Sequence, residues 1–191
     1  MTKKVSEQPK NSRHEIIMAG LGGMGVLSAG QILSRAAFQT YKHVSYAPTY
    51  GFAMRGGLCQ CTVIFSDERI ASPLLDQAQA VMLLDSSQFS ALEPRVRPGG
   101  IIIADSAGLC AERERNDYKL YALPAVQTAV SMGTSLVRNF ILLGFYVAIL
   151  GTVSSEIIEA EIQRRYSNNV KMLGRNLEAF KRGLELGKGA T

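Results

Sequence analysis

The chain has 191 residues, of which 47% are hydrophobic and 19% are charged, and its formal net charge is +5. This length suits one α/β domain with a buried core, and the composition is typical of a globular protein. A net charge of +3 lies within residues 1–13, and no basic stripe with interleaved aromatic residues follows, so we expect no nucleic-acid partner.

Residues 1–13 are predicted to form a disordered basic leader, and residues 14–191 a single α/β domain. The leader lacks the apolar segment of a signal peptide. The longest apolar stretch, at 140–150, has eleven residues, which is too short to span a membrane. We therefore expect a cytoplasmic protein without a membrane segment.

The domain is expected to begin with a β–loop–α–β unit. The apolar run HEIIMAG at 14–20 predicts a strand. GVLSAGQILSRAAFQT at 25–40 predicts a helix, because its apolar residues recur along one stripe. HVSYAP at 43–48 predicts a second strand that ends at its proline. A strand, a helix and a strand in this order are typical of the crossover unit of a parallel sheet.

A β-hairpin is predicted next, as an insertion before the parallel sheet resumes. Its arms are LCQCTVIFS at 58–66 and RIAS at 69–72, which flank an acidic dipeptide. Cys59 and Cys61 share one face of the first arm, where we interpret them as small hydrophobic residues and not as a metal or redox site. Together with Cys110 they form no C-x-x-C pair, so the chain offers no iron–sulfur ligand set.

Further parallel strands are predicted at AVMLLD (80–85) and GIIIADS (100–106), because short apolar runs are typical of strands covered on both faces. A helix is expected between them, with a turn at PGG (98–100). YKLYALP at 118–124 predicts a fifth strand of this series.

From residue 125 onward the pattern is helical, and the run 135–151 is apolar on most sides, so we expect a buried helix there. The predicted fold class is therefore α/β. It comprises a Rossmann-like, mostly parallel sheet with an inserted β-hairpin and a C-terminal helical segment.

The loop between the first strand and the first helix carries glycines at 20, 22, 23 and 25, a G-x-G-x-x-G pattern with one extra glycine. Such a loop lets the chain turn sharply, so that backbone amides and the helix N-terminus face a phosphate or pyrophosphate. The alternative is a tight turn that binds nothing. The flanking strand and helix favour anion binding.

A nicotinamide dinucleotide site requires an acidic residue near the end of the second strand. Here that strand continues as YAPTYG, without an acid. His14 and His43 lie at strand starts, away from the expected ligand crevice, and are interpreted as structural. A stand-alone NAD(P)-dependent dehydrogenase is therefore the second interpretation, and a non-catalytic binding module is the third.

Two more features are candidate ligand contacts. Asp85 ends the strand expected beside the first one, where it either contacts a ligand or caps the following helix. In TYGFAMRGG (49–57), Arg55 offers a planar cation, and Gly56 and Gly57 allow close backbone approach. The alternative for Arg55 is a solvated loop residue; the position of this loop near the glycine loop favours a functional or subunit contact.

The chain resembles the gamma subunit of 2-oxoacid:ferredoxin oxidoreductases, which include the pyruvate, 2-oxoglutarate, branched-chain and indolepyruvate enzymes. The resemblance rests on GLGGMG, YGFAMRGG, the IASP segment and RNFILLG, and it covers roughly residues 14–186. It implies a non-catalytic subunit of an enzyme that oxidatively decarboxylates a 2-oxoacid to an acyl-CoA. The isolated chain is then expected to be inactive.

The resemblance also implies the cofactors and the partners. Thiamine diphosphate and iron–sulfur clusters belong to partner subunits, alpha and beta and in some complexes a ferredoxin-like delta, which pass electrons to ferredoxin. Coenzyme A is the cofactor expected at the glycine loop. No catalytic residue and no metal ligand is expected in this chain, and the residues leave open whether the isolated chain forms a homodimer.

The residues expected to bind the cofactor are Gly20, Leu21, Gly22, Gly23, Met24, Gly25, Ser28, Thr49, Arg55, Gly56, Gly57 and Asp85.

Overall fold

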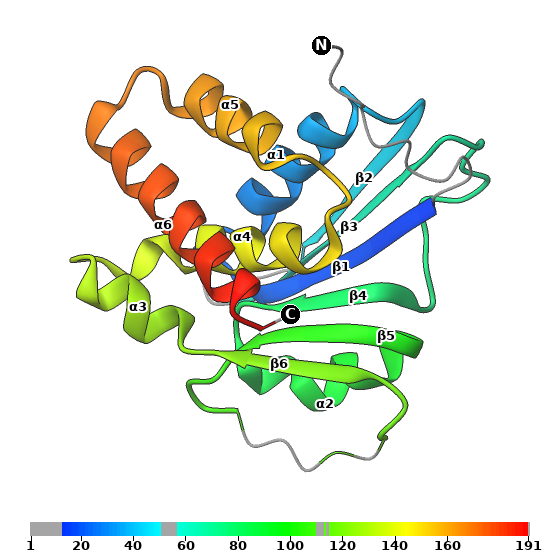
Figure 1. Ribbon diagram of the computed structural model, residues 1–191. Coiled ribbons are helices and arrows are strands. Elements are labelled where there is room, and N and C mark those ends of the chain that lie inside the picture. The colour runs from blue at the N-terminus through cyan, green and yellow to red at the C-terminus, as the bar shows by residue number, and fades with distance from the viewer. Residues whose placement is uncertain (1–12, 51–56, 110–112, 114, 191) are drawn as a thin grey trace.

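The computed structural model describes residues 13–50, 57–109, 113 and 115–190 (Figure 1). Its strands are β1 (Arg13–Leu21), β2 (His43–Tyr50), β3 (Leu58–Ser66), β4 (Ala78–Leu83), β5 (Val96–Asp105) and β6 (Lys119–Leu123). Its helices are α1 (Val26–Ala37), α2 (Phe89–Leu92), α3 (Ala125–Ser131), α4 (Arg138–Leu150), α5 (Ser155–Tyr166) and α6 (Val170–Lys188), with short 3-10 turns η1 (Ser86–Gln88), η2 (Glu93–Arg95) and η3 (Ser135–Val137). The expected α/β class is confirmed. Arg13, placed in the leader, already belongs to β1.

The six strands form one sheet in the order β2-β3-β1-β4-β5-β6. The neighbours β1, β4, β5 and β6 run parallel, whereas β3 is antiparallel to both β1 and β2. Strands β1 and β2 are consequently parallel to each other but not adjacent, because β3 lies between them. The predicted β–α–β unit therefore exists with a strand inserted into it.

The prediction of a second hairpin arm at 69–72 is wrong, because these residues form no strand. The antiparallel partners of β3 are β1 and β2 instead. The reason is burial: Val63, Ile64 and Phe65 are all fully buried, so both faces of this strand need cover and it takes a central position. The segment RIAS is mostly exposed and has no apolar face to bury.

The expected turn at 98–100 is displaced, since these residues lie within β5. The register of β4 and β5 shifts between the pairs Ala78–Val96 and Ala80–Ile101, so the extra residues of β5 bulge out. Gly99 adopts a positive φ of 75° in this bulge. The Pro-Gly-Gly sequence thus forms a bulge within β5 and not a turn before it.

Helices cover the two faces of the sheet unequally (Figure 1). Ile16 and Met18 belong to the larger core cluster, which they share with residues of α1, α4, α5 and α6. Ile17 and Ala19 belong to the smaller cluster with α2. Alternate residues of β1 thus face opposite layers, as the two-residue period of a strand requires. The apolar run of β1 is buried on both faces for this reason.

Helix α4 is the buried helix that the sequence predicts at 135–151, and it packs against α6 at very close range. A Cβ atom on Gly144 would meet the carbonyl oxygen of Phe180, and one on Gly183 would meet that of Ile141. The two helix backbones therefore touch at these glycines. Within the described part of the chain, no helix is long and apolar enough to cross a membrane.

Candidate functional site

The glycine loop connects β1 to α1 through two left-handed residues. Gly23 has a φ of 95° and Gly25 a φ of 81°, values that favour glycine because other residues carry a Cβ. The N–H of Gly22 donates to the carbonyl of Gly57 at 2.9 Å, and the N–H of Met24 donates to the carbonyl of Leu21 at 3.2 Å. The loop is thereby held in a compact turn against the start of β3.

The N-terminus of α1 differs from the starts of the two helices that end the chain. Gly25 is its N-cap and provides no side-chain hydrogen bond, and the first turn of α1 contains no acidic residue. By contrast, side chains of Ser154 and Asn169 accept from the first turns of α5 and α6. The first N–H groups of a helix need an acceptor from outside it. In α1 the first N–H groups point toward the glycine loop, which lies at the positive end of the helix dipole.

A cavity of about 280 Å³ adjoins this loop. Three segments that are distant in sequence form it: the start of α1, the η3–α4 junction and the first turns of α6, with one residue from the end of α5. Its lining residues are Gly23, Gly25, Ser28, Thr134, Leu136, Val137, Asn139, Phe140, Tyr166, Met172, Arg175 and Asn176. The cavity thus collects the N-terminal ends of three helices.

The polar groups of the cavity suit an anion. Arg175 supplies a guanidinium group and makes no ion pair with the described part of the chain. Ser28 adds a hydroxyl group from the first turn of α1. No carboxylate is among the described residues that line the cavity. A cation, a hydroxyl group and unoccupied helix amides are the groups that proteins use to hold phosphate.

Asn139 and Asn176 are two amides of the cavity wall, and both are at least nine-tenths buried. The Nδ2 atom of Asn139 donates to the carbonyl of Gly25 at 3.1 Å. Its Oδ1 atom, and the Nδ2 atom of Asn176, have no hydrogen-bond partner among the described residues. Neither asparagine is among the residues expected from the sequence.

Three of the expected residues, Gly23, Gly25 and Ser28, come together in the cavity wall. The others in the loop, Gly20, Leu21, Gly22 and Met24, are not among its lining residues. Gly20 is buried against Leu84, and its Cβ would be 3.0 Å from the Leu84 Cβ. The Met24 thioether accepts a hydrogen bond from the Leu21 N–H at 3.4 Å. These neighbours shape the turn and do not line the cavity.

The remaining expected residues lie elsewhere. Asp85 caps η1, since its carboxylate accepts from the Ser87 N–H at 2.9 Å, which agrees with the second of its two interpretations. Thr49 pairs with Gln60, which pairs with Ala19, so two strand spacings separate Thr49 from β1. Neither Asp85 nor Thr49 lines the cavity. Arg55 and Gly56 lie outside the described residues, and their roles stay predictions.

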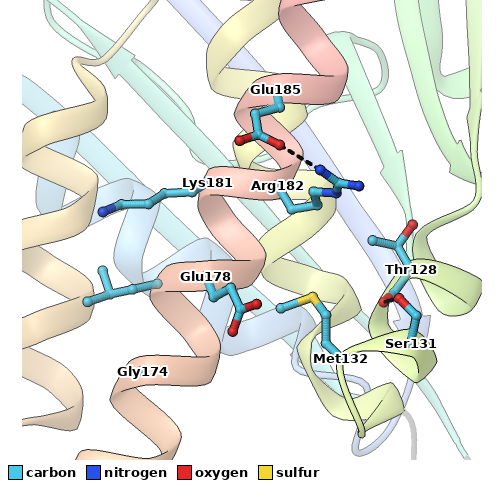
Figure 2. A pocket seen from close by; sticks show the side chains of 9 residues that line it. Thr128, Ser131, Met132, Gly174, Glu178, Lys181, Arg182 and Glu185 are labelled. Carbon is cyan, nitrogen blue, oxygen red and sulfur yellow. Dashed lines mark hydrogen bonds and ion pairs between the residues drawn. The ribbon is translucent and has the colours of Figure 1, made fainter.

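A larger hollow of about 700 Å³ lies between α3 and α6 (Figure 2). Its cations are already paired: Arg182 forms an ion pair with Glu185 at 2.8 Å, and Lys181 points away toward Glu159 of α5, at 3.5 Å. Its wall is therefore close to neutral. The smaller cavity beside the glycine loop is the better candidate for a binding site.

Cys59, Cys61 and His14 pack against core residues, as the sequence predicts, whereas Cys110 lies outside the described residues. Burial raises the pKa of the Cys61 thiol to about 12, and the neighbouring Cys59 contributes in the same direction. Cys61 packs beneath α1, where a Cβ on Gly30 would be 2.5 Å from its Sγ. His14 stacks near Phe65, with ring centroids 5.2 Å apart. The described residues contain no cluster of His, Cys, Asp and Glu that could hold a metal.

Sequence reasoning missed Asn139, Arg175 and Asn176. Asn139 lies in the RNFILLG motif, which supports the family resemblance, so a signal for this residue is present. Arg175 and Asn176 occupy an amphipathic helix whose pattern gives no sign of a ligand. Their proximity to the glycine loop follows only from the packing of α4 on α6.

Residues 15–186 match the family model described as pyruvate ferredoxin/flavodoxin oxidoreductase. The ketoisovalerate oxidoreductase subunit VorA of Methanothermobacter thermautotrophicus is 31% identical over 94% of this chain, which spans 37% of that relative's length. The 2-oxoglutarate synthase subunit KorC of Archaeoglobus fulgidus is 32% identical over 92% of this chain and 89% of its own.

Two solved structures share the fold. The gamma subunit of a keto/oxoacid ferredoxin oxidoreductase from Geobacter sulfurreducens has a TM-score of 0.79 and 28% identity, covering 92% of this chain and 99% of its own. A 2-oxoglutarate:ferredoxin oxidoreductase from Magnetococcus marinus, solved with 2-oxoglutarate, coenzyme A and succinyl-CoA bound, has a TM-score of 0.85 at 23% identity. It covers 96% of this chain, which matches 32% of that longer chain.

Proposed function

The chain belongs to the pyruvate ferredoxin/flavodoxin oxidoreductase family, and we propose that it acts as the gamma subunit of a 2-oxoacid:ferredoxin oxidoreductase. The similarity to the Geobacter gamma subunit and to KorC, each over most of both chains, supports this role. VorA carries the same domain within a longer chain. The remaining domains of the enzyme are then partner subunits for this chain.

The reaction proposed for the whole complex is the oxidative decarboxylation of a 2-oxoacid. The carboxylate leaves as CO2, the acyl group passes to the thiol of coenzyme A, and two electrons reduce ferredoxin. Thiamine diphosphate and iron–sulfur clusters in the partner subunits supply the carbanion and electron chemistry. The described part of this chain contributes no cluster of metal ligands. Its own task is to bind and orient one substrate.

That substrate is coenzyme A, held by a phosphate group in the cavity beside the glycine loop. The single observation that carries this assignment is the uncapped start of α1, which faces a cavity that contains Arg175 and no carboxylate among its described residues. A volume of about 280 Å³ accommodates a phosphate or pyrophosphate group but not a whole coenzyme A molecule. The pantetheine arm is then free to extend toward a partner subunit.

The dehydrogenase alternative is less well supported. In a nicotinamide site, an acid at the end of the strand next to β1 binds the ribose hydroxyl groups. Here β3 takes the place next to β1 and runs in the opposite direction, so its start, Leu58 and Cys59, lies beside the loop. Neither side chain has a carboxylate that could accept hydrogen bonds from the ribose hydroxyl groups.

The proposed subunit role is tested by purifying the tagged chain from its native host and identifying the proteins that accompany it. We expect stoichiometric partners that bind thiamine diphosphate and iron–sulfur clusters, with CoA-dependent reduction of ferredoxin by a 2-oxoacid. The chain alone is expected to be inactive. Purification as a lone protein that oxidises substrates with NAD or NADP would support the dehydrogenase instead.

A further inference from the structure

The side chain of Asn139 links α4 to the glycine loop across 114 residues of sequence. Its Nδ2 atom donates to the carbonyl of Gly25 at 3.1 Å. The same carbonyl accepts the N–H of Ala29 at 3.0 Å, which is the first helical hydrogen bond of α1. One oxygen atom thus joins the loop, the start of α1 and the start of α4.

The contact is tight enough to determine the residue at position 25. An ideal Cβ on Gly25 would lie 2.5 Å from the Asn139 Nδ2 and 2.9 Å from its Cγ. Real Cβ atoms do not approach other heavy atoms so closely, so either the loop or the amide would have to move. Gly23, two residues earlier, shares the positive φ but has no atom within 4 Å of the same position. The amide therefore makes Gly25 the more constrained of the two.

The packing of α4 leaves Asn139 little freedom to move. The backbones of α4 and α6 are in contact at Gly144 and Gly183, so the two helices cannot come closer together there. Asn139 is 2% exposed, and its Oδ1 atom has no partner among the described residues. A buried amide that satisfies only one of its two polar atoms is a costly choice for packing alone.

We propose that Asn139 is a positioning residue for coenzyme A binding. Its hydrogen bond fixes the orientation of the Gly25 carbonyl, and thereby directs the N–H groups in the first turn of α1 toward the phosphate in the cavity. The residue itself does not contact the phosphate. This inference rests on the proposed function of the cavity, and it assigns the orientation of the loop to a residue of the C-terminal half of the chain.

The test is a double-mutant cycle of Asn139→Ala and Gly25→Ala, read in the reconstituted complex as the KM for coenzyme A. Asn139→Ala is expected to raise this KM about tenfold, as for one lost hydrogen bond, with the KM for the 2-oxoacid unchanged. Gly25→Ala is expected to be more harmful in the wild-type background than in the Asn139→Ala background, because truncation of the amide removes the clash. Ile162→Val, in the core of α5, serves as a control for a small general loss of stability.

A KM for coenzyme A within twofold of wild type in Asn139→Ala, or strictly additive effects in the cycle, overturns the positioning role. Hydrogen exchange in the isolated chain separates this outcome from failure of the proposed function. If Asn139 positions the loop, its removal speeds exchange of the Ala29 amide and leaves that of Ile17 in β1 unchanged, whether or not coenzyme A is the ligand. Unchanged exchange at Ala29 contradicts the inference, whereas absence of coenzyme A binding by the wild-type complex contradicts the proposed function on which the inference rests.

Discussion

Arg175 is the residue on which the charge of the candidate site depends. It is the single cation among the described residues that line the cavity, and it stands one turn into α6. An arginine can give two parallel hydrogen bonds to a phosphate, whereas a lysine gives only a point charge. The affinity for coenzyme A should therefore depend both on the charge and on the shape of this side chain.

We expect Arg175→Ala to weaken coenzyme A binding about tenfold to a hundredfold, the loss of one charge-assisted contact of about 1.5–3 kcal/mol. Arg175→Lys should recover part of the affinity. The measurement is a calorimetric titration, with Arg182→Ala as the matched control, because Arg182 lies on the same helix but is paired with Glu185 in the other hollow. Equal losses in the two alanine variants would show that the effect is not specific to the cavity.

His14 should make the stability of the fold depend on pH. Burial lowers the pKa of its imidazole below the ordinary value near 6.5. Below that value the unfolded chain binds the proton more readily than the folded one, so stability falls as the pH decreases. We expect the urea midpoint to decrease between about pH 7.5 and 5.5, and to decrease less in His14→Phe. Parallel pH profiles for the two proteins would contradict this assignment.

At the scale of elements, the contact between α4 and α6 holds the site together. It brings Asn139 from one helix and Arg175 and Asn176 from the other to the glycine loop. The close approach depends on glycines, since a Cβ at Gly144 or Gly183 would collide with the facing backbone. The same helices bury much of the larger core cluster, so the site and the fold share this contact.

We expect Gly183→Ala to lower the free energy of unfolding by about 1–3 kcal/mol, the usual cost of overpacking, and to weaken coenzyme A binding as the helices separate. Gly174→Ala is the matched control on the same helix, because nothing lies within 4 Å of a Cβ there. That variant should gain up to about 1 kcal/mol from the better helix propensity of alanine. Thermal unfolding measures both changes, and a stable Gly183→Ala would refute the close approach of the two helices.

The sequence predicts the helices and strands better than it predicts which strands pair and which helices pack together. The runs that form β1, α1, β4 and β6 are recognisable from periodicity and from glycine or proline signals. The position of β3 in the sheet is not recognisable from the sequence, because strand pairing depends on which strand must be buried on both faces. The segment RIAS adds to the difficulty, since its local sequence resembles the second arm of a hairpin. Likewise the glycine loop is evident, but Asn139 and Arg175 reach it only through the packing of the C-terminal helices.

At the scale of the whole molecule, the sheet separates two unequal layers. The smaller layer contains α2, and the larger contains α1 with the C-terminal helices (Figure 1). The glycine loop opens on the larger side, at the ends of β1 and β4, where connections to opposite faces of the sheet diverge. Ligands of open α/β sheets are typically bound at such a point. The cavity adjoins this point on the β1 side only, since residues of the glycine loop and of α1 line it and the described residues that follow β4 do not. Its walls come from both halves of the sequence.

We propose that the cavity beside the glycine loop recognises coenzyme A by its phosphate groups. The most direct measurement is a calorimetric titration of the full chain with coenzyme A and with pantetheine, which has no phosphate. We predict that coenzyme A binds, that inorganic pyrophosphate competes with it, and that pantetheine does not bind measurably. Equal binding of coenzyme A and pantetheine, or binding of coenzyme A that pyrophosphate leaves unchanged, would contradict the proposal.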